Sequence, residues 1–180
     1  RRAERVRTVA LQVQGLIMES QSLAIASQSR DIIGYQVEVD DSQATLFQLK
    51  LNNPRDNFEP GTIDLSEITR EEIKNPIKFG KWVKRDYFGF VNNYNLAITS
   101  VTAVAPGGRL LFNNQEPDLN QSGISPQDNF YNPLALPPWR NEYNVGMLRF
   151  SLKITGPNLT QYIRVIKING QSGKVEILGD

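Results

Sequence analysis

One long polar segment contains a group of side chains whose types and spacing could bind a metal ion. Asp118, Asn120 and Asp128 carry oxygen ligands, and Gly123 is the sixth residue counted from Asp118, as in a calcium-binding loop. The twelfth residue is Asn129, where an EF-hand requires a bidentate glutamate, so the segment is not an EF-hand. Calcium at Asp118, Asn120 and Asp128 is therefore one interpretation, and a solvated polar loop is the other.

The composition removes most of the side chains that enzymes use for catalysis. The chain has 180 residues with no Cys and no His, so it lacks a thiol nucleophile and the commonest general base. It also lacks a glycine-rich phosphate loop and a nucleophile elbow. The adjacent carboxylates at 40–41 and 71–72 are typical of turns and surfaces. We therefore expect that the chain is not an enzyme and that it holds no cofactor other than the candidate calcium ion.

Charge and hydropathy indicate a soluble globular domain. Apolar residues make up 39 % of the chain and charged residues 22 %, with a formal net charge of +1. This charge argues against nucleic-acid binding, and Trp82 beside Lys81, Lys84 and Arg85 fits a solvated strand edge better than a nucleic-acid contact. The sequence contains no run of about 18 apolar residues, so we expect no membrane-spanning helix within it.

Residues 1–29 have the pattern of one long amphipathic helix. A second apolar row, Leu11, Met18 and Ile25, steps by seven and lies roughly a quarter to a third of a turn from the centre of the main stripe. This row is either the margin of a wide core face or a ridge that contacts a partner, and we expect at least two of its three side chains to be exposed. The main stripe, which steps by three and four, consists of Val6, Val9, Ala10, Val13, Leu16, Ile17, Ser20, Leu23 and Ala24.

The start of this helix lacks a capping signal. Arg1, Arg2, Arg5 and Arg7 are opposed only by Glu4, and cations in a first turn oppose the helix dipole. We therefore expect that the chain was cut from a longer protein, that the helix continues upstream, and that its first two turns project from the body.

The remainder, 30–180, predicts a β-rich domain with a long polar loop at about 113–144. Alternation on either side of a turn at 40–42 predicts a β-hairpin. Residues 62–68 favour a short strand, with a capped helical turn near 70–74 as the alternative. One helix followed by about seven to nine strands predicts an α+β fold, in which the helix covers one face of an antiparallel sheet. Further strands are expected within 82–91, 96–105, 109–112, 145–155, 162–168 and 174–178.

A basic helix start, a helix that ends in small residues, an immediate hairpin and a closing hairpin occur at residues 1–5, 20–27, 34–39, 44–47, 162–165 and 172–177. Together these segments resemble the type IV pilin-like proteins, in particular pseudopilins and minor pilins of the FimT-like kind. The family's peptidase cleavage site and hydrophobic N-terminal segment do not occur in these residues, and the middle third of the chain carries no resemblance.

The resemblance implies a structural subunit of a type IV pilus-like filament or a type II secretion pseudopilus. Such a subunit is anchored in the bacterial inner membrane by the missing segment, faces the periplasm or cell surface, and has other pilin or pseudopilin subunits as partners. Leu11, Met18 and Ile25 would then be the assembly interface. Whether the filament is retractile, serves DNA uptake or serves secretion stays open. The alternative is a secreted β-rich module that binds a ligand, such as a glycan, through the loop at 113–144.

Overall fold

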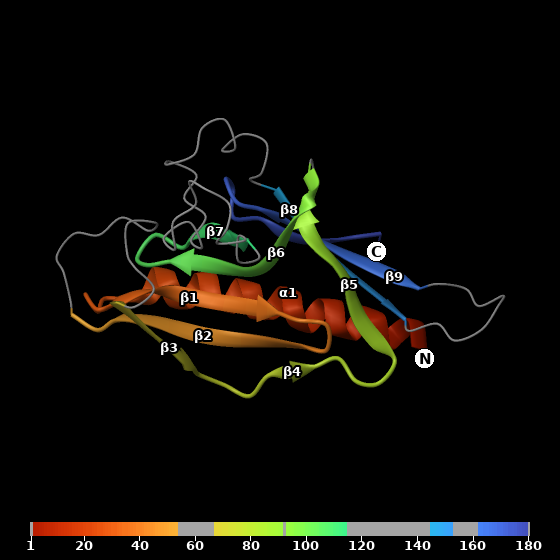
Figure 1. The fold of residues 1–180 in the computed structure, drawn as a ribbon, viewed down its shortest axis with the longest axis horizontal. Helices are drawn as coiled ribbons and strands as arrows, with labels where there is room; N and C mark the ends of the chain where they lie inside the picture. The colour runs from red at the N-terminus through yellow and green to blue at the C-terminus, as the bar shows by residue number, and fades with distance from the viewer. Residues whose placement is uncertain (1, 54–66, 92, 115–144, 153–161, 180) are drawn as a thin grey trace, which may run out of the picture.

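One helix and ten strands form the part of the chain that the computed structural model describes, residues 2–53, 67–91, 93–114, 145–152 and 162–179. The helix α1 (Arg2–Ala26) opens the chain, and the strands follow it (Figure 1). The strands are β1 (Ile32–Val39), β2 (Gln43–Leu51), β3 (Ile68–Glu72), β4 (Ile77–Lys78), β5 (Val83–Phe90), β6 (Asn93–Val104), β7 (Arg109–Asn114), β8 (Val145–Leu152), β9 (Ile163–Asn169) and β10 (Val175–Leu178).

The expected α+β class is wrong, because the fold is dominated by its antiparallel sheet. Strand accounts for 53 % of the structure, against a single N-terminal helix. A separate, local difference concerns residues 70–72, for which the sequence also allowed a helical turn and which belong to β3. There Glu71 pairs with Gln48 and Glu72 with Phe47 of β2. Pairing with a neighbouring strand outweighs the weak helical preference of this charged segment.

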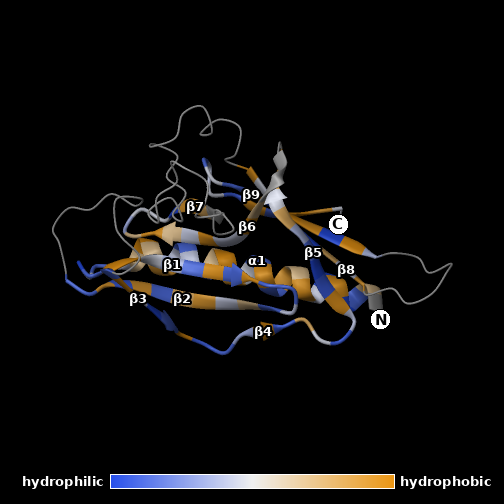
Figure 2. Ribbon diagram, viewed as in Figure 1, coloured by the Kyte–Doolittle hydropathy of each residue, from blue (hydrophilic) through white to orange (hydrophobic). Residues whose placement is uncertain are grey.

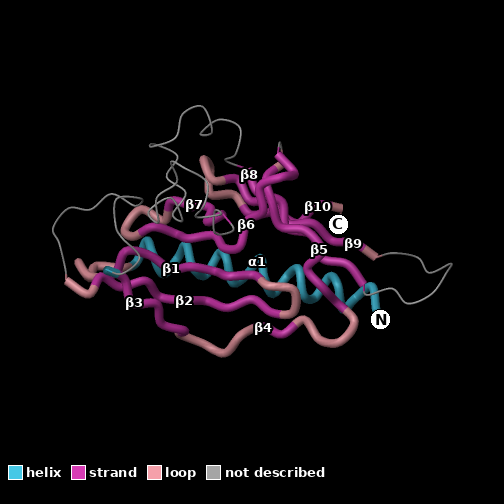
Figure 3. The backbone as a smooth tube through the Cα atoms, in the orientation of Figure 1, coloured by secondary structure: helices cyan, strands magenta, loops and turns pink. Residues whose placement is uncertain are grey.

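The strands form one sheet with two halves, which β6 joins (Figure 3). Near its start β6 pairs with β5, where Ala97 lies opposite Gly89. Further along, Val101 of β6 lies between Val37 of β1 and Phe112 of β7. We call the strands β7, β6, β1, β2, β3 and β4 sheet half A. The strands β5, β8, β9 and β10 form sheet half B.

The helix contacts strands of both halves, including β1 and β6 of half A and β8, β9 and β10 of half B. Apolar and polar bands alternate along it (Figure 2). The apolar stripe that the sequence predicts is confirmed: Val6, Val9, Ala10, Val13, Ile17 and Ala24 have no exposed surface and Leu16 is 3 % exposed. Leu23 is half-buried against this core. Ser20 is also buried, and its hydroxyl donates to the carbonyl oxygen of Ile17 at 2.5 Å.

The first turns of α1 do not project from the body, so that expectation is wrong. Val6 and Val9 are fully buried within the core. Arg5 donates from Nε to the carbonyl oxygen of Phe79 and from a terminal nitrogen to that of Lys78, both at 3.2 Å. These bonds fix the start of the helix to the segment between β4 and β5, which the sequence pattern around Arg5 could not reveal.

Two pairs of aromatic rings help to fill the core. Phe79 and Phe150 meet edge to face with ring centroids 5.1 Å apart, and Phe90 and Phe112 do so at 5.4 Å. Phe90 belongs to half B and Phe112 to half A, so the second pair joins the halves. Gly146 of β8 lies against this pair, because a Cβ atom there would stand 2.7 Å from the ring of Phe112.

Among the residues that the structure describes, no helix is both long enough and apolar enough to cross a membrane.

Candidate assembly interface

The outward face of α1 carries a ridge formed by Leu11, Met18 and Ile25. Their side chains are 40 %, 50 % and 62 % exposed, so the prediction that at least two would be exposed is confirmed. The residues are seven apart, which is two turns of an α-helix, and they therefore form a row nearly parallel to the helix axis. Large apolar side chains in such a row are typical of a surface that another molecule covers.

The surface around the ridge carries little charge. Between Thr8 and Ala26, the only ionisable side chain of the helix is Glu19. Its carboxylate lies 3.0 Å from the ammonium group of Lys74, in the connection between β3 and β4. A partner that covered the ridge would therefore remove few charges from water. Removing charges from water costs free energy and would oppose binding.

Two glutamines hold the flank of the helix that faces half B. Gln14 donates from Nε2 to the carbonyl oxygen of Val175 at 3.0 Å, and Gln21 donates to that of Gly173 at 2.7 Å. Both acceptors belong to the β9–β10 hairpin or to the edge strand β10. With Lys74 on the other flank, these contacts fix the rotation of α1 so that the ridge faces outward.

Sequence reasoning missed Gln14 and Gln21. A signal was present, because two glutamines seven residues apart border the buried stripe. Their acceptors are backbone atoms far along the chain, which a sequence pattern does not identify.

The C-terminal end of the ridge rests on the turn between β6 and β7. Gly108 of this turn has a φ of 75°, and a Cβ atom there would lie 2.7 Å from Cγ1 of Ile25. The turn therefore requires glycine both for its backbone conformation and for the close approach of Ile25. Ile25 is the most exposed member of the ridge, yet one side of it lies against this turn.

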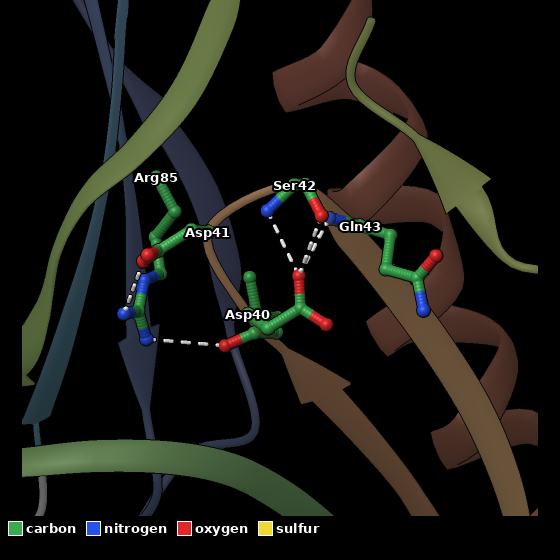
Figure 4. Close-up of polar contacts among 6 residues, drawn as sticks. Asp40, Asp41, Ser42, Gln43 and Arg85 are labelled. Atoms are coloured by element: carbon green, nitrogen blue, oxygen red, sulfur yellow. Dashed lines mark hydrogen bonds and ion pairs between the residues drawn. The ribbon is translucent and has the colours of Figure 1, made fainter.

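The polar residues of the β1–β2 turn form hydrogen bonds and an ion pair that hold the turn in place (Figure 4). Asp40 accepts hydrogen bonds at Oδ1 from the backbone nitrogens of Ser42 and Gln43, at 2.8 and 2.9 Å. Arg85 of β5 donates to the carbonyl oxygen of Val39 at 3.1 Å and pairs with Asp41 at 2.9 Å. The Asp40–Asp41 pair thus shapes the turn, and Arg85 ties this turn of half A to half B.

One carboxyl group near the end of the helix has a shifted pKa. Asp31 accepts a hydrogen bond from the hydroxyl of Ser29 and lies 3.2 Å from the ammonium group of Lys50. The bond from Ser29, followed by that from Lys50, lowers the pKa of Asp31 below its usual range. Because this group is only partly buried and is already paired, it stabilises the connection from α1 to β1 and does not have the setting of a catalytic acid.

The candidate calcium ligands Asp118, Asn120 and Asp128 lie outside the described residues, as does nearly all of the expected loop at 113–144. Within the described ranges, no three His, Cys, Asp or Glu side chains are grouped so that they could hold a metal ion. The calcium interpretation therefore stays a prediction.

Among the residues that the structure describes, the ridge is thus a row of exposed apolar side chains that another protein could cover. No protein-family model, no curated protein and no solved structure matches the chain.

Proposed function

We propose that this protein is a structural subunit of a filament of the type IV pilus or type II secretion pseudopilus kind, and that it assembles through the outward face of α1. The observation that carries the proposal is the exposed ridge of Leu11, Met18 and Ile25 on a helix whose opposite face is buried against the subunit's own sheet. One face of α1 is needed to hold the subunit's own sheet. The other face remains for neighbouring subunits.

The setting of the ridge supports a protein partner of similar chemistry. The surface beside it carries one charged helix residue, Glu19, which is paired within the chain. The helix is held in place by bonds on both flanks, so it would present the same surface to every neighbour. Contacts that join unlike surfaces of successive copies and do not close on themselves produce a filament rather than a ring.

The proposal places the natural protein at the bacterial inner membrane, with this domain in the periplasm or on the cell surface. Its partners would be copies of itself or other pilin-like subunits. An enzyme is not proposed, because the described residues offer charged groups that are paired in turns and at strand edges rather than gathered around a reacting centre.

The test is a double substitution, Leu11→Asp with Met18→Asp. Because both positions are exposed, we expect the free energy of unfolding to change by about 0.5 kcal/mol per site or less. Filaments sheared from cells of the source organism should then lack the variant. A matched control, Gln28→Asp with Gln171→Asp, adds the same charge at exposed positions away from the ridge and should assemble normally.

Two outcomes would contradict the proposal. If the double variant unfolds in urea far more easily than the parent, the ridge belongs to the core. If it enters filaments as well as the control, the ridge is not the assembly surface. Either result would put the alternative, a secreted ligand-binding module, ahead of the filament subunit.

A further inference from the structure

Exposed apolar side chains also gather at one end of half B, beside the start of α1. Trp82 directly precedes β5, Tyr162 directly precedes β9, and Leu178 ends β10. The start of α1 lies at the same end, because Arg5 binds carbonyl oxygens of the segment that leads from β4 into β5 (Figure 1). The exposed side chains are Trp82 at 40 %, Tyr162 at 39 %, Ile163 at 37 % and Leu178 at 37 %.

The register of half B places a lysine among these side chains. Ser151 of β8 lies opposite Lys84 of β5 and opposite Ile163 of β9, so two strand spacings, about 10 Å, separate Lys84 from Ile163. Residues that lie opposite one another share a face of the sheet. Because Val83, the neighbour of Lys84, is buried in the core with α1, this shared face is the one turned away from the helix.

This end of half B is basic. Segments 77–85 and 162–168 together contain six lysine or arginine residues and no aspartate or glutamate. Lys81 and Lys84 are exposed, and the ammonium nitrogen of Lys81 lies 5.3 Å from the centroid of the Trp82 ring. Cationic and apolar groups therefore share one surface. We call this surface the half-B patch, and it consists of Lys81, Trp82, Lys84, Tyr162, Ile163 and Leu178.

The carboxylates near the patch are held by cations outside it. Within the described part of half B, the acidic residues are one on β5 and one on β10, and both form ion pairs. One carboxylate of the adjoining β1–β2 turn does the same. The pairs are Asp86 with Arg149 at 2.8 Å, Glu176 with Lys174 at 3.4 Å and Asp41 with Arg85 at 2.9 Å. The ammonium groups of Lys81 and Lys84 therefore give the patch its positive charge.

We infer that the half-B patch binds the surface of a bilayer that contains anionic phospholipids. Lysine ammonium groups are attracted to the phosphates of such a surface. Trp and Tyr rings favour the level of the headgroups, because each combines an apolar ring with a polar group. Ile163 and Leu178 would leave water at the boundary with the acyl chains. The contact would use this domain's own surface, so it goes beyond the proposed function, which assigns the ridge on α1.

The combination of side chains favours a bilayer over other partners. Lysine is depleted in protein–protein interfaces, whereas at a bilayer its stem can cover apolar surface while the ammonium group stays among the phosphates. A nucleic acid would use the lysines but would leave Ile163 and Leu178 without a role. The chain also has a formal net charge of only +1, which gives little general attraction to nucleic acid.

The patch and the ridge lie on opposite sides of the molecule. Lys84 and Ile163 face away from α1, whereas Leu11, Met18 and Ile25 lie on the side of α1 that is turned away from the sheet. A subunit that rested on a bilayer through the patch would therefore keep its ridge clear of lipid. The ridge would remain accessible to a neighbouring subunit while the membrane contact lasted.

The first experiment sediments the 180-residue chain with vesicles of phosphatidylglycerol and phosphatidylcholine in equal parts, and with vesicles of phosphatidylcholine alone. We expect binding to the anionic vesicles and its loss in high salt, which screens the attraction. Lys81→Gln with Lys84→Gln should weaken binding about fivefold for each lysine removed. The control, Lys50→Gln with Lys74→Gln, removes the same charge from exposed lysines outside the patch and should bind like the parent.

Fluorescence reports whether the apolar part of the patch enters the bilayer. The chain has two tryptophans, so Trp139→Phe leaves Trp82 as the only one. The emission of Trp82 should shift to shorter wavelength on anionic vesicles, and bromine-labelled lipid should quench it. Ile163→Asp in the same background should reduce both changes, because a carboxylate at this position opposes removal of the surface from water.

Four results would overturn the inference. They are no binding to anionic vesicles, equal binding by the parent and by Lys81→Gln with Lys84→Gln, binding that leaves the emission of Trp82 unchanged, and tighter binding to duplex DNA than to the vesicles at the same salt. A dimer in solution that Ile163→Asp disperses would instead assign the patch to a second copy and would also overturn it. The test of the ridge with Leu11→Asp and Met18→Asp is independent, so the inference and the proposed function can fail separately.

Discussion

The inner and outer faces of α1 are both apolar, but the structure treats them differently. Val13 and Ile17 on the inner face have no exposed surface, whereas Leu11 and Met18 on the outer face are 40 % and 50 % exposed. The inner stripe consists mostly of β-branched residues and alanines that fit closely against both sheet halves. The outer row consists of large side chains separated by small or polar ones. The apolar character of a face therefore does not by itself reveal whether that face of the helix lies in the core. In this helix the two faces differ in the sizes of their side chains and in what separates them.

The sharpest test of the difference between the faces uses two adjacent residues. Ile17→Ala should lower the free energy of unfolding by about 2–5 kcal/mol, because it leaves a cavity in a closely packed core. Met18→Ala should change it by about 0.5 kcal/mol or less, because the side chain is half exposed. Urea denaturation of the two variants measures both values.

A similar loss of stability in both variants would contradict the distinction. It would mean that Met18 contributes to the core of the isolated domain. A loss in Ile17→Ala alone would show that the exposed row is dispensable for folding and remains available for binding.

The flanks of the helix offer a second test. Gln14→Ala and Gln21→Ala each remove one hydrogen bond to a backbone carbonyl of the β9–β10 region. Each should lower the free energy of unfolding by about 1 kcal/mol. Gln12→Ala is the control, because Gln12 is exposed on the same helix. Amide hydrogen exchange should also show faster exchange in β10 for the two variants.

If removal of these glutamines changes neither stability nor exchange, the helix is positioned by its buried stripe alone. The orientation of the ridge would then depend only on the packing of the core. A selective effect on β10 would support the view that the glutamines fasten the edge of half B to α1.

Local patterns were sufficient to predict several elements of this fold. The buried stripe of α1 followed from helical spacing, and the β1–β2 hairpin followed from alternation around Asp40. The exposed row followed from its spacing of seven residues. In each case the decisive information lay within one or two turns of helix or one hairpin, where periodicity is a direct consequence of backbone geometry.

The parts that sequence reasoning missed depend on residues far apart in the chain. Arg5 binds carbonyl groups 73 and 74 residues away, which keeps the first turns of the helix against the body. Gln14 and Gln21 bind carbonyl groups 161 and 152 residues away. The strand character of Glu71 and Glu72 comes from pairing with β2. Such contacts leave no periodic signal in the segment that makes them.

The last comparison concerns Gly15 on the outer face of α1, where a substitution should stabilise the isolated subunit but weaken assembly. Gly15→Ala should raise the free energy of unfolding by about 1 kcal/mol, because alanine favours an exposed helix position and the added methyl group meets no atom within 4 Å. Gly108→Ala is the contrasting variant and should destabilise the domain, because its φ is 75° and Ile25 occupies the space of the new methyl group. Thermal unfolding followed by circular dichroism measures both changes. Gly15 is exposed on the same side of α1 as Met18, so under the proposed function an added methyl group would stand at the surface that a neighbouring subunit covers. The variant that stabilises the subunit should therefore assemble less well. A Gly15→Ala protein that is both more stable and fully competent in assembly would show that Gly15 lies outside the assembly surface.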